Sequence, residues 1–115
     1  MSVPGFILFA HGARDPAWAH PFEAVRAHVQ QLRPDTQVVL AFLEFMTPTL
    51  PEAARQLAAQ GCTDIQVVPL FLGAGGHVRK DLPQLMQTLA QQHPGVHWTL
   101  QPAIGEDPDV IAAMA

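Results

Sequence analysis

The chain carries little charge and almost no cysteine. Only 14% of its 115 residues are charged, and the formal net charge is -4. No run of Lys or Arg occurs, which argues against nucleic acid as the main partner, because binding a phosphate backbone needs several cationic contacts. The single Cys62 can form no intrachain disulfide, and without a CxxC pair the sequence contains no cysteine-rich zinc site. We interpret Cys62 as a small, half-buried structural thiol.

Long hydrophobic stretches are missing as well. Apolar runs such as residues 67–72 are far shorter than the roughly 20 residues that span a bilayer. The N-terminus has no basic segment followed by a long apolar one, so we expect no signal peptide, no membrane partner and a cytoplasmic protein. Apolar residues make up 49% of the chain, enough for a packed core. Because separate cores need roughly 100 to 200 residues each, we expect one domain over residues 1–115.

Four apolar segments predict β-strands. The first three are near-continuous hydrophobic runs, the pattern of strands that are covered on both faces of a parallel sheet. The predicted strands are residues 6–10, 37–45, 65–72 and 96–100.

Helical patterns alternate with these strands. Apolar residues from Trp18 to Leu32 recur at steps of three and four, and Asp15-Pro16 is a typical helix start. A second helix is predicted from Leu50, after a capping box formed by Thr49 and Glu52, to Gly61.

The third helix is predicted to carry its buried stripe on leucines and a methionine between Leu82 and Leu89, with Asp81 as its cap. Asp107-Pro108 predicts the start of a fourth. This order of elements predicts a three-layer α/β fold, in which a four-stranded parallel sheet is flanked by helices on both faces. Ligands of such sheets bind beyond the carboxyl ends of the strands.

Candidate functional residues gather at those strand ends. His11 follows the first strand, Glu44 lies near the end of the second, and His77 closes a glycine-rich segment after the third. Two imidazoles and a carboxylate suit Fe, Co, Ni or Zn and leave coordination positions open. Histidine also takes up protons near neutral pH. A lone histidine or glutamate at a strand end is commonly a hydrogen-bonded turn residue or a solvated carboxylate, but their joint placement favours a metal site.

Glycines and basic residues flank these positions. Gly73, Gly75 and Gly76 lack the further glycine of GxGxxG and the GK[ST] of a P-loop, which argues against nucleotide binding. We expect them to let the backbone approach a flat ligand, or to adopt positive φ. The basic residues near the two histidine loops either bind carboxylates or are ordinary surface charges; they are Arg14, Arg79 and Lys80. We interpret the other histidines as structural: His20, His28, His93 and His97.

Three motifs resemble a known family. HGARDP (residues 11–16), AFLEF (41–45) and VVPLFLGAGGHVRKDLP (67–83) are together similar to the small CbiX/SirB-type class II chelatases, which insert cobalt or iron into sirohydrochlorin. The resemblance implies a chelatase-like fold, with His11 and His77 as metal ligands and Glu44 assisting them. Ala13 stands where the family usually has a serine, and no asparagine occurs early in the first predicted helix.

The resemblance also implies a reaction. The divalent metal, Co²⁺ or Fe²⁺ with Ni²⁺ as a further alternative, is a substrate, and no organic cofactor is expected. The partner is sirohydrochlorin or a related acidic tetrapyrrole, bound near Gly75 and Gly76 and by Arg14, Arg79 and Lys80. A domain of this size is too small to enclose a planar tetrapyrrole alone, so we expect a homodimer with the cleft between subunits. The alternatives are a non-catalytic carrier of metal or tetrapyrrole, and a metal-assisted hydrolase.

Overall fold

The computed structural model describes residues 3–73 and 75–115, except for the side chain of His77. These residues form four strands, four α-helices and two short 3₁₀ helices. Their order is β1 (Pro4–Ala10), η1 (Pro16–Ala19), α1 (His20–Leu32), β2 (Gln37–Phe42), α2 (Leu50–Ala59), β3 (Asp64–Pro69), α3 (Gly76–Gln92), β4 (His97–Leu100), η2 (Ile104–Glu106) and α4 (Pro108–Met114).

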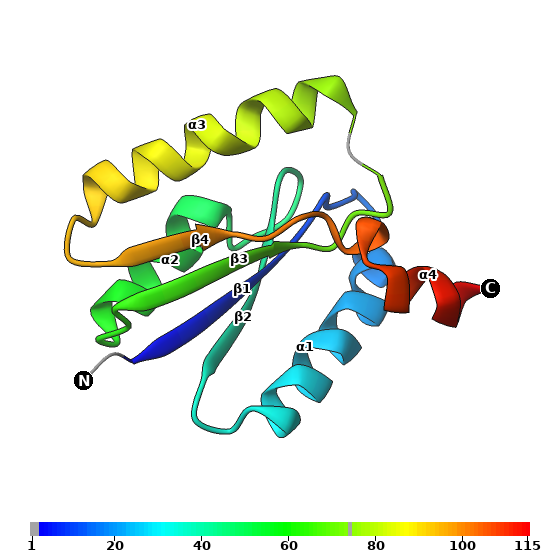
Figure 1. The fold of residues 1–115 in the computed structure, drawn as a ribbon, viewed down its shortest axis with the longest axis horizontal. Coiled ribbons are helices and arrows are strands. Elements are labelled where there is room, and N and C mark those ends of the chain that lie inside the picture. The colour runs from blue at the N-terminus through cyan, green and yellow to red at the C-terminus, as the bar shows by residue number, and fades with distance from the viewer. Residues whose placement is uncertain (1–2, 74) are drawn as a thin grey trace.

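The four strands form one parallel sheet in the order β2-β1-β3-β4 (Figure 1). In the centre of the sheet, Leu8 of β1 lies opposite Leu40 of β2 and Val68 of β3. β3 pairs with β4 in the same direction. All four carboxyl ends therefore meet at one edge, which confirms the predicted sheet and identifies the edge where a ligand is expected.

Helices cover the two faces of the sheet unequally. Alternate residues of β1 enter two cores: Ile7 and Phe9 pack under α2 and α3, whereas Leu8 and Ala10 pack under α1. Figure 1 shows α3 above the sheet and α1 below it. The three layers of the predicted α/β fold are thus confirmed.

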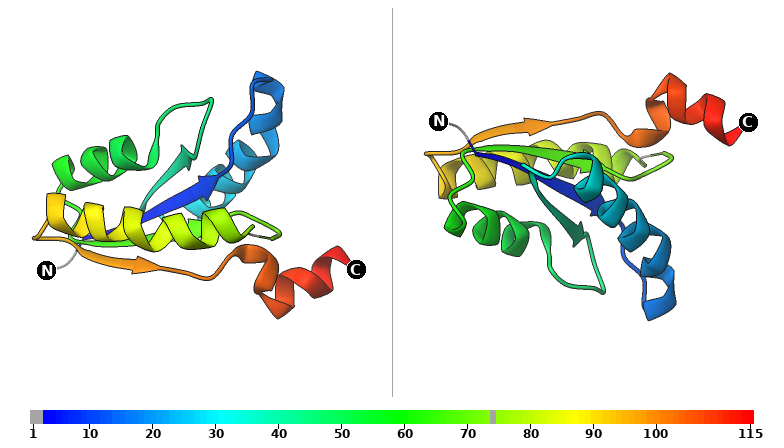
Figure 2. Two further views of the ribbon diagram at one scale, coloured as in Figure 1. Left: turned by 90° about the horizontal axis from the view of Figure 1, so that it is seen from above. Right: turned by 90° about the horizontal axis from the view of Figure 1, so that it is seen from below.

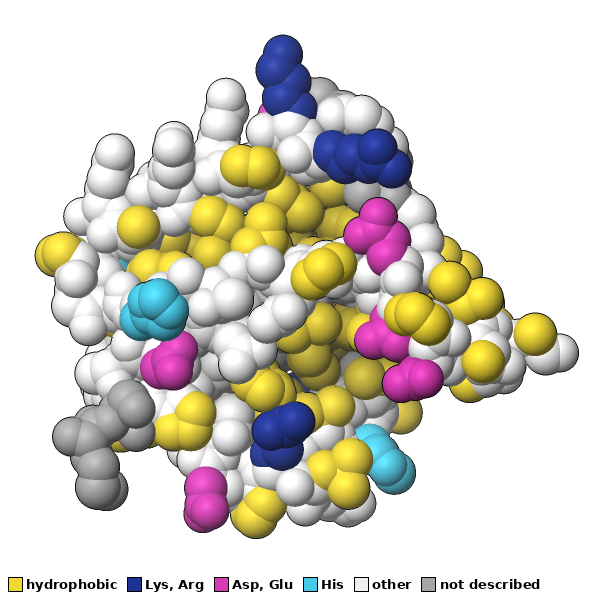
Figure 3. Space-filling view, viewed as in Figure 1, with side chains coloured by type: hydrophobic (Ala, Val, Ile, Leu, Met, Phe, Trp, Pro, Cys, Tyr) yellow, Lys and Arg dark blue, Asp and Glu magenta, His cyan; other side chains and the backbone are white. Residues whose placement is uncertain are grey.

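One part of the predicted burial is wrong. β3 was expected to be covered on both faces, but its residues alternate between buried and half-buried. Val68 is only half-buried, because α1 packs mainly over β1 and β2. The short α4 lies beyond the carboxyl edge of the sheet rather than over β3 (Figure 2). Hydrophobic side chains are therefore visible at the surface beside β4 in the space-filling view (Figure 3).

The structure also corrects three boundaries. β2 ends at Phe42 and β3 at Pro69, so each is three residues shorter than predicted at its carboxyl end. α3 begins at Gly76 instead of near Leu82, and Asp81 lies inside the helix rather than capping it. The early start follows from Val78, which packs against the core and extends the apolar stripe by one turn. Pro83 is accommodated within this helix on an exposed position.

The capping box at the start of α2 is present as predicted. The Glu52 backbone N–H donates to the Thr49 hydroxyl at 3.3 Å, and the Thr49 backbone N–H donates to the Glu52 carboxylate at 3.0 Å. The hydrogen bond from the Thr49 backbone lowers the pKa of Glu52, and its side chain lowers it further. The loop after β2 therefore enters α2 with two backbone donors satisfied.

We expect the replacement Glu52→Gln to reduce the free energy of unfolding at neutral pH. A carboxyl whose pKa is depressed by folding stabilises the native state above its unfolded pKa, and this contribution is lost as the pH falls through the folded pKa. The stability difference between wild type and variant should therefore shrink as the solution is acidified below the ordinary carboxyl range. Urea titrations over a series of pH values measure it; a difference independent of pH would contradict the assignment.

A close backbone contact ties the loop after β1 to the loop after β2. Leu43 N–H donates to the Ala10 carbonyl at 2.9 Å and Glu44 N–H to the His11 carbonyl at 3.0 Å, so the pairing of β1 and β2 continues past the end of β2. Gly12 has a φ of 89°, and a Cβ at this position would overlap the Glu44 carbonyl oxygen. Only glycine fits here.

The replacement Gly12→Ala tests this contact against Gly61→Ala. Gly61 has the same φ of 89°, but nothing lies within 4 Å of the position of its Cβ. We expect about 1–2 kcal/mol of destabilisation for Gly61→Ala, from backbone strain alone. We expect about 2–5 kcal/mol for Gly12→Ala, where steric overlap adds to the strain. Chemical denaturation measures the free energy of unfolding of both variants. An equal loss in the two would contradict the steric overlap, because it would mean that the Glu44 carbonyl moves aside at no cost.

Candidate metal and substrate site

His11 is held in place at the end of β1. Its ring stacks on Phe71, with 4.1 Å between ring centroids and 29° between planes. Phe71 is buried in the core under α2 and α3 and also contacts Phe9. Because the half-buried imidazole rests on a fixed aromatic surface, its nitrogens are presented from a rigid position rather than from a flexible loop.

A cavity of about 370 Å³ opens beside this histidine. Its wall comes from the carboxyl end of β1, from the segment after β2 and from α3. The lining residues are His11, Leu43, Glu44, Val78, Asp81, Leu82 and Leu85. The structure thus brings two of the predicted site residues, His11 and Glu44, to one cavity at the predicted sheet edge. Apart from Asp81, the rest of the wall is apolar, with Leu43 from the segment after β2 and the other side chains from α3.

Asp81 is a site residue that sequence reasoning missed. It was interpreted as a helix cap, yet it lies within α3 and lines the cavity that holds His11. The signal for it was its spacing, because Asp81 comes four residues after His77, about one helical turn. An acidic residue at this position adds negative charge to a cavity that is expected to receive a divalent cation.

His77 is the second residue of α3, at the same edge of the sheet. Its side chain lies outside the described part of the structure. Among the side chains that are described, no three His, Cys, Asp or Glu residues are grouped closely enough to hold a metal ion. The predicted metal set of His11, His77 and Glu44 therefore stays a prediction.

The glycines before α3 leave open space beside the backbone. Nothing lies within 4 Å of a Cβ placed on Gly73, Gly75 or Gly76, and none of the three has a positive φ. The expectation of positive φ is therefore wrong here, and close approach of a ligand is the interpretation that remains. Gly75 caps α3 without a side-chain hydrogen bond. The first turn of the helix thus keeps backbone donors for an anionic group.

None of the three basic residues lines the cavity beside His11. The Arg14 guanidinium lies over the Phe45 ring, 5.1 Å from its centroid. Arg79 lines a neighbouring cavity of about 360 Å³ together with Gln101 and Glu106. Lys80 is exposed. Figure 3 shows basic side chains over the start of α3 and acidic side chains over η2 and α4.

Phe45 follows Glu44 in an unusual conformation. Its φ is 68°, in the left-handed region that costs a side-chain-bearing residue on the order of 1–2 kcal/mol. Its side chain is 58% exposed. Burial thus offers little compensation for the strain, and sequence reasoning gave Phe45 no role beyond the strand.

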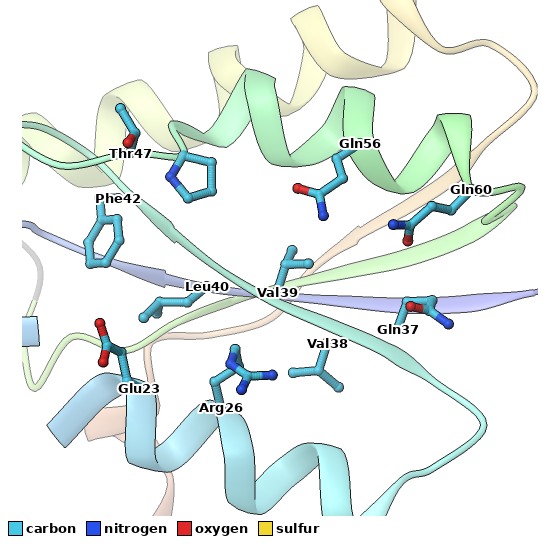
Figure 4. Close-up of a pocket in the computed structure, with 11 residues that line it drawn as sticks. Glu23, Arg26, Gln37, Val38, Val39, Leu40, Phe42, Thr47, Gln56 and Gln60 are labelled. Atoms are coloured by element: carbon cyan, nitrogen blue, oxygen red, sulfur yellow. The ribbon is translucent and has the colours of Figure 1, made fainter. Parts of the chain in front are cut away.

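A second cavity and the single cysteine do not contribute to the candidate metal site. A larger cavity of about 560 Å³ lies along the edge strand β2, between α1 and α2 (Figure 4). Among the residues that the structure describes, Glu23 and Arg26 are its only charged lining residues, and no histidine lines it. Cys62 was expected to be half-buried but is fully buried, and burial raises the pKa of its thiol. This disfavours the reactive thiolate and supports a structural role.

The remaining histidines lie outside the candidate site. None of His20, His28, His93 and His97 lines the cavity beside His11. His20, His28 and His97 are exposed, and His93 contacts Trp98 with 6.0 Å between ring centroids. Within the described residues, no helix is both long enough and apolar enough to cross a bilayer.

Comparison with known proteins identifies the family. The CbiX family model matches residues 5–115. A sirohydrochlorin cobaltochelatase from Saccharolobus solfataricus is 37% identical over 82 residues, which are 71% of this chain and 62% of that protein. The match thus spans less than two thirds of this curated relative.

Solved structures share the fold. A CbiX protein of cobalamin biosynthesis from Marinobacter aquaeolei superposes with a TM-score of 0.85 at 33% identity, covering 96% of this chain and 88% of that one. SirB from Bacillus subtilis, solved with Fe³⁺ and with cobalt, gives TM-scores of 0.83 and 0.78 at 26% and 27% identity. In both, 98% of this chain covers less than half of SirB, 44% and 48%. The matches in sequence and in fold show that the chain belongs to the CbiX family.

Proposed function

We propose that this protein inserts a divalent metal ion into sirohydrochlorin or a closely related acidic tetrapyrrole. The observation that carries the proposal is the shared cavity of His11 and Glu44 at the carboxyl edge of the sheet, in a chain of the CbiX family. The sirohydrochlorin cobaltochelatase from S. solfataricus supports the choice of reaction.

The chemistry needs a metal donor and a proton acceptor. His11 and His77, with Glu44, present M²⁺ through an incomplete ligand set, so that pyrrole nitrogens can replace protein ligands. Two pyrrole N–H protons leave as the metal enters, and imidazole is the side chain best suited to accept them near neutral pH. The stack of His11 on Phe71 keeps one donor fixed during this exchange. No covalent intermediate with the protein is required.

The metal is a substrate, and we propose Co²⁺ or Fe²⁺, with Ni²⁺ as a further possibility. SirB structures with cobalt and with Fe³⁺ support the first two. Imidazole affinity rises from Fe²⁺ through Co²⁺ to Ni²⁺, so the metal used in the cell depends on supply as well as on the site. The protein brings no organic cofactor to this reaction in our proposal.

Carboxylates on the rim of the macrocycle need cationic partners. Arg14 lies over Phe45, next to Glu44, Arg79 lines the neighbouring cavity, and Lys80 follows on α3. The uncapped first turn of α3 at Gly75 and Gly76 adds backbone donors with room for close approach. We propose that these groups orient the tetrapyrrole over the cavity while His11 and Glu44 face its centre.

We further propose that residues 1–115 act as one chelatase-like domain and pair as a homodimer. A cavity of about 370 Å³ is at the low end for small-molecule sites and is too small to enclose a tetrapyrrole. Nearly the whole chain corresponds to less than half of SirB. A second copy would supply the missing wall of the cleft. The cytoplasm stays our expectation for its compartment.

Replacing either histidine should abolish metal insertion. We expect His11→Ala and His77→Ala to lower the rate of Co²⁺ insertion into sirohydrochlorin at least about 100-fold, because each removes a ligand and a proton acceptor. Absorbance of the metallated product measures the rate, and circular dichroism checks the fold. The exposed His28 of α1 provides the control, since His28→Ala should keep the wild-type rate.

The same assay separates the proposal from its alternatives. An enzyme releases metallated product in excess of protein, whereas a carrier stops at one equivalent. A metal-assisted hydrolase would cleave esters or phosphates and ignore tetrapyrroles. Wild-type rates in both histidine variants would overturn the site.

The homodimer should be visible in solution. We expect light scattering to give twice the mass of the 12.5 kDa chain, and specific activity to fall on dilution below the dimer dissociation constant. The fall is expected because each cleft needs walls from two copies. A strictly monomeric protein with undiminished activity when dilute would contradict the shared cleft.

A further inference from the structure

Phe45 presents a large aromatic side chain to solvent at the rim of the candidate site. It directly follows Glu44, which lines the cavity with His11. The ring is 58% exposed, and the residue adopts a φ of 68°. Leu72, in the segment after β3, is the other exposed large hydrophobic residue that closely follows a strand of this sheet edge, at 64%. A strained, exposed aromatic residue next to a site is a reason to look for a ligand.

The surrounding backbone holds Phe45 in this position. Before it, Glu44 N–H is bonded to the His11 carbonyl at 3.0 Å. After it, the Pro48 carbonyl accepts a hydrogen bond at 2.9 Å from the Phe42 N–H, which closes the loop. The loop is thus fixed at both ends, one of them directly at the histidine that faces the cavity. Main-chain hydrogen bonds thus fix the backbone of this loop relative to His11.

Arg14 defines which side of the ring is occupied. Its guanidinium carbon lies 5.1 Å from the Phe45 ring centroid, over one face. A cation over one face holds the ring in orientation. The 58% exposure of the residue leaves ring surface for stacking. The same guanidinium can pair with a carboxylate of a ligand that stacks on the ring.

We propose that Phe45 is a substrate-stacking residue, whose free face lies against the conjugated ring system of the tetrapyrrole while Arg14 supports it from behind. This inference rests on the proposed function and adds a binding determinant to it. Flat conjugated ligands gain affinity from aromatic stacking without any hydrogen-bond readout. Phe45 thereby positions the macrocycle so that its centre faces His11 and Glu44.

The test measures equilibrium binding of metal-free sirohydrochlorin, by absorbance titration, to the full chain. We expect Phe45→Ala and Phe45→Gly each to raise Kd about tenfold, since both remove the stacking surface. Phe45→Trp should keep the wild-type Kd within about threefold, because it restores a larger ring. Leu32→Ala, at a leucine that is 70% exposed at the far end of α1, should leave Kd unchanged.

The glycine variant separates binding from stability. Glycine adopts a φ of 68° without strain, so Phe45→Gly should melt at a higher temperature than Phe45→Ala while binding equally weakly. A purely structural Phe45 predicts instead that Kd follows stability, and that result would overturn the inference. A wild-type Kd in both variants also overturns the inference. So does a Phe45→Ala variant that dissociates into monomers but whose remaining dimer binds sirohydrochlorin with the wild-type Kd. Failure of the wild type itself to bind sirohydrochlorin overturns the proposed function and the stacking role together.

Discussion

Two hydrogen bonds carry the pairing of β1 and β2 past the end of β2, from Leu43 to Ala10 and from Glu44 to His11. They can form only because Gly12 turns away with a φ of 89° and has no Cβ to meet the Glu44 carbonyl oxygen. These contacts between the two loops therefore fix the backbone positions of His11, Glu44 and Phe45. The roles proposed for His11, Glu44 and Phe45 depend on that placement.

The two sides of the site differ in how firmly they are held. His11 rests on Phe71, which belongs to the main core, so the donor on β1 is part of the rigid sheet. The facing side is the first turn of α3, where Gly75 caps the helix without a side-chain bond and the glycines leave open space. A fixed metal ligand opposite an open stretch of backbone suits a reaction in which a large planar tetrapyrrole enters, takes up the metal and leaves.

Much of the fold was predictable because periodicity reports burial directly. The parallel sheet, its strand-helix alternation and the capping box of Thr49 and Glu52 follow from local pattern and are present. The errors arose where a residue's role depends on a distant neighbour. α3 starts at Gly76 because Val78 reaches the core, although glycines in sequence argue against a helix. β3 lost cover on one face because α4 lies beyond the sheet edge.

By itself, the sequence determined the fold class, the sheet edge that bears the site, and the pairing of a histidine and a glutamate there, because strand ends and hydrophobic runs are local properties. Tertiary structure alone decided that His11 stacks on Phe71, that Asp81 lines the cavity and that Phe45 is exposed under strain. Those features arise from contacts between segments up to 60 residues apart, such as the hydrogen bond between Ala10 and Leu43 and the stack of His11 on Phe71. No pattern within a single segment encodes such contacts, since they form only once the sheet has brought its carboxyl ends together.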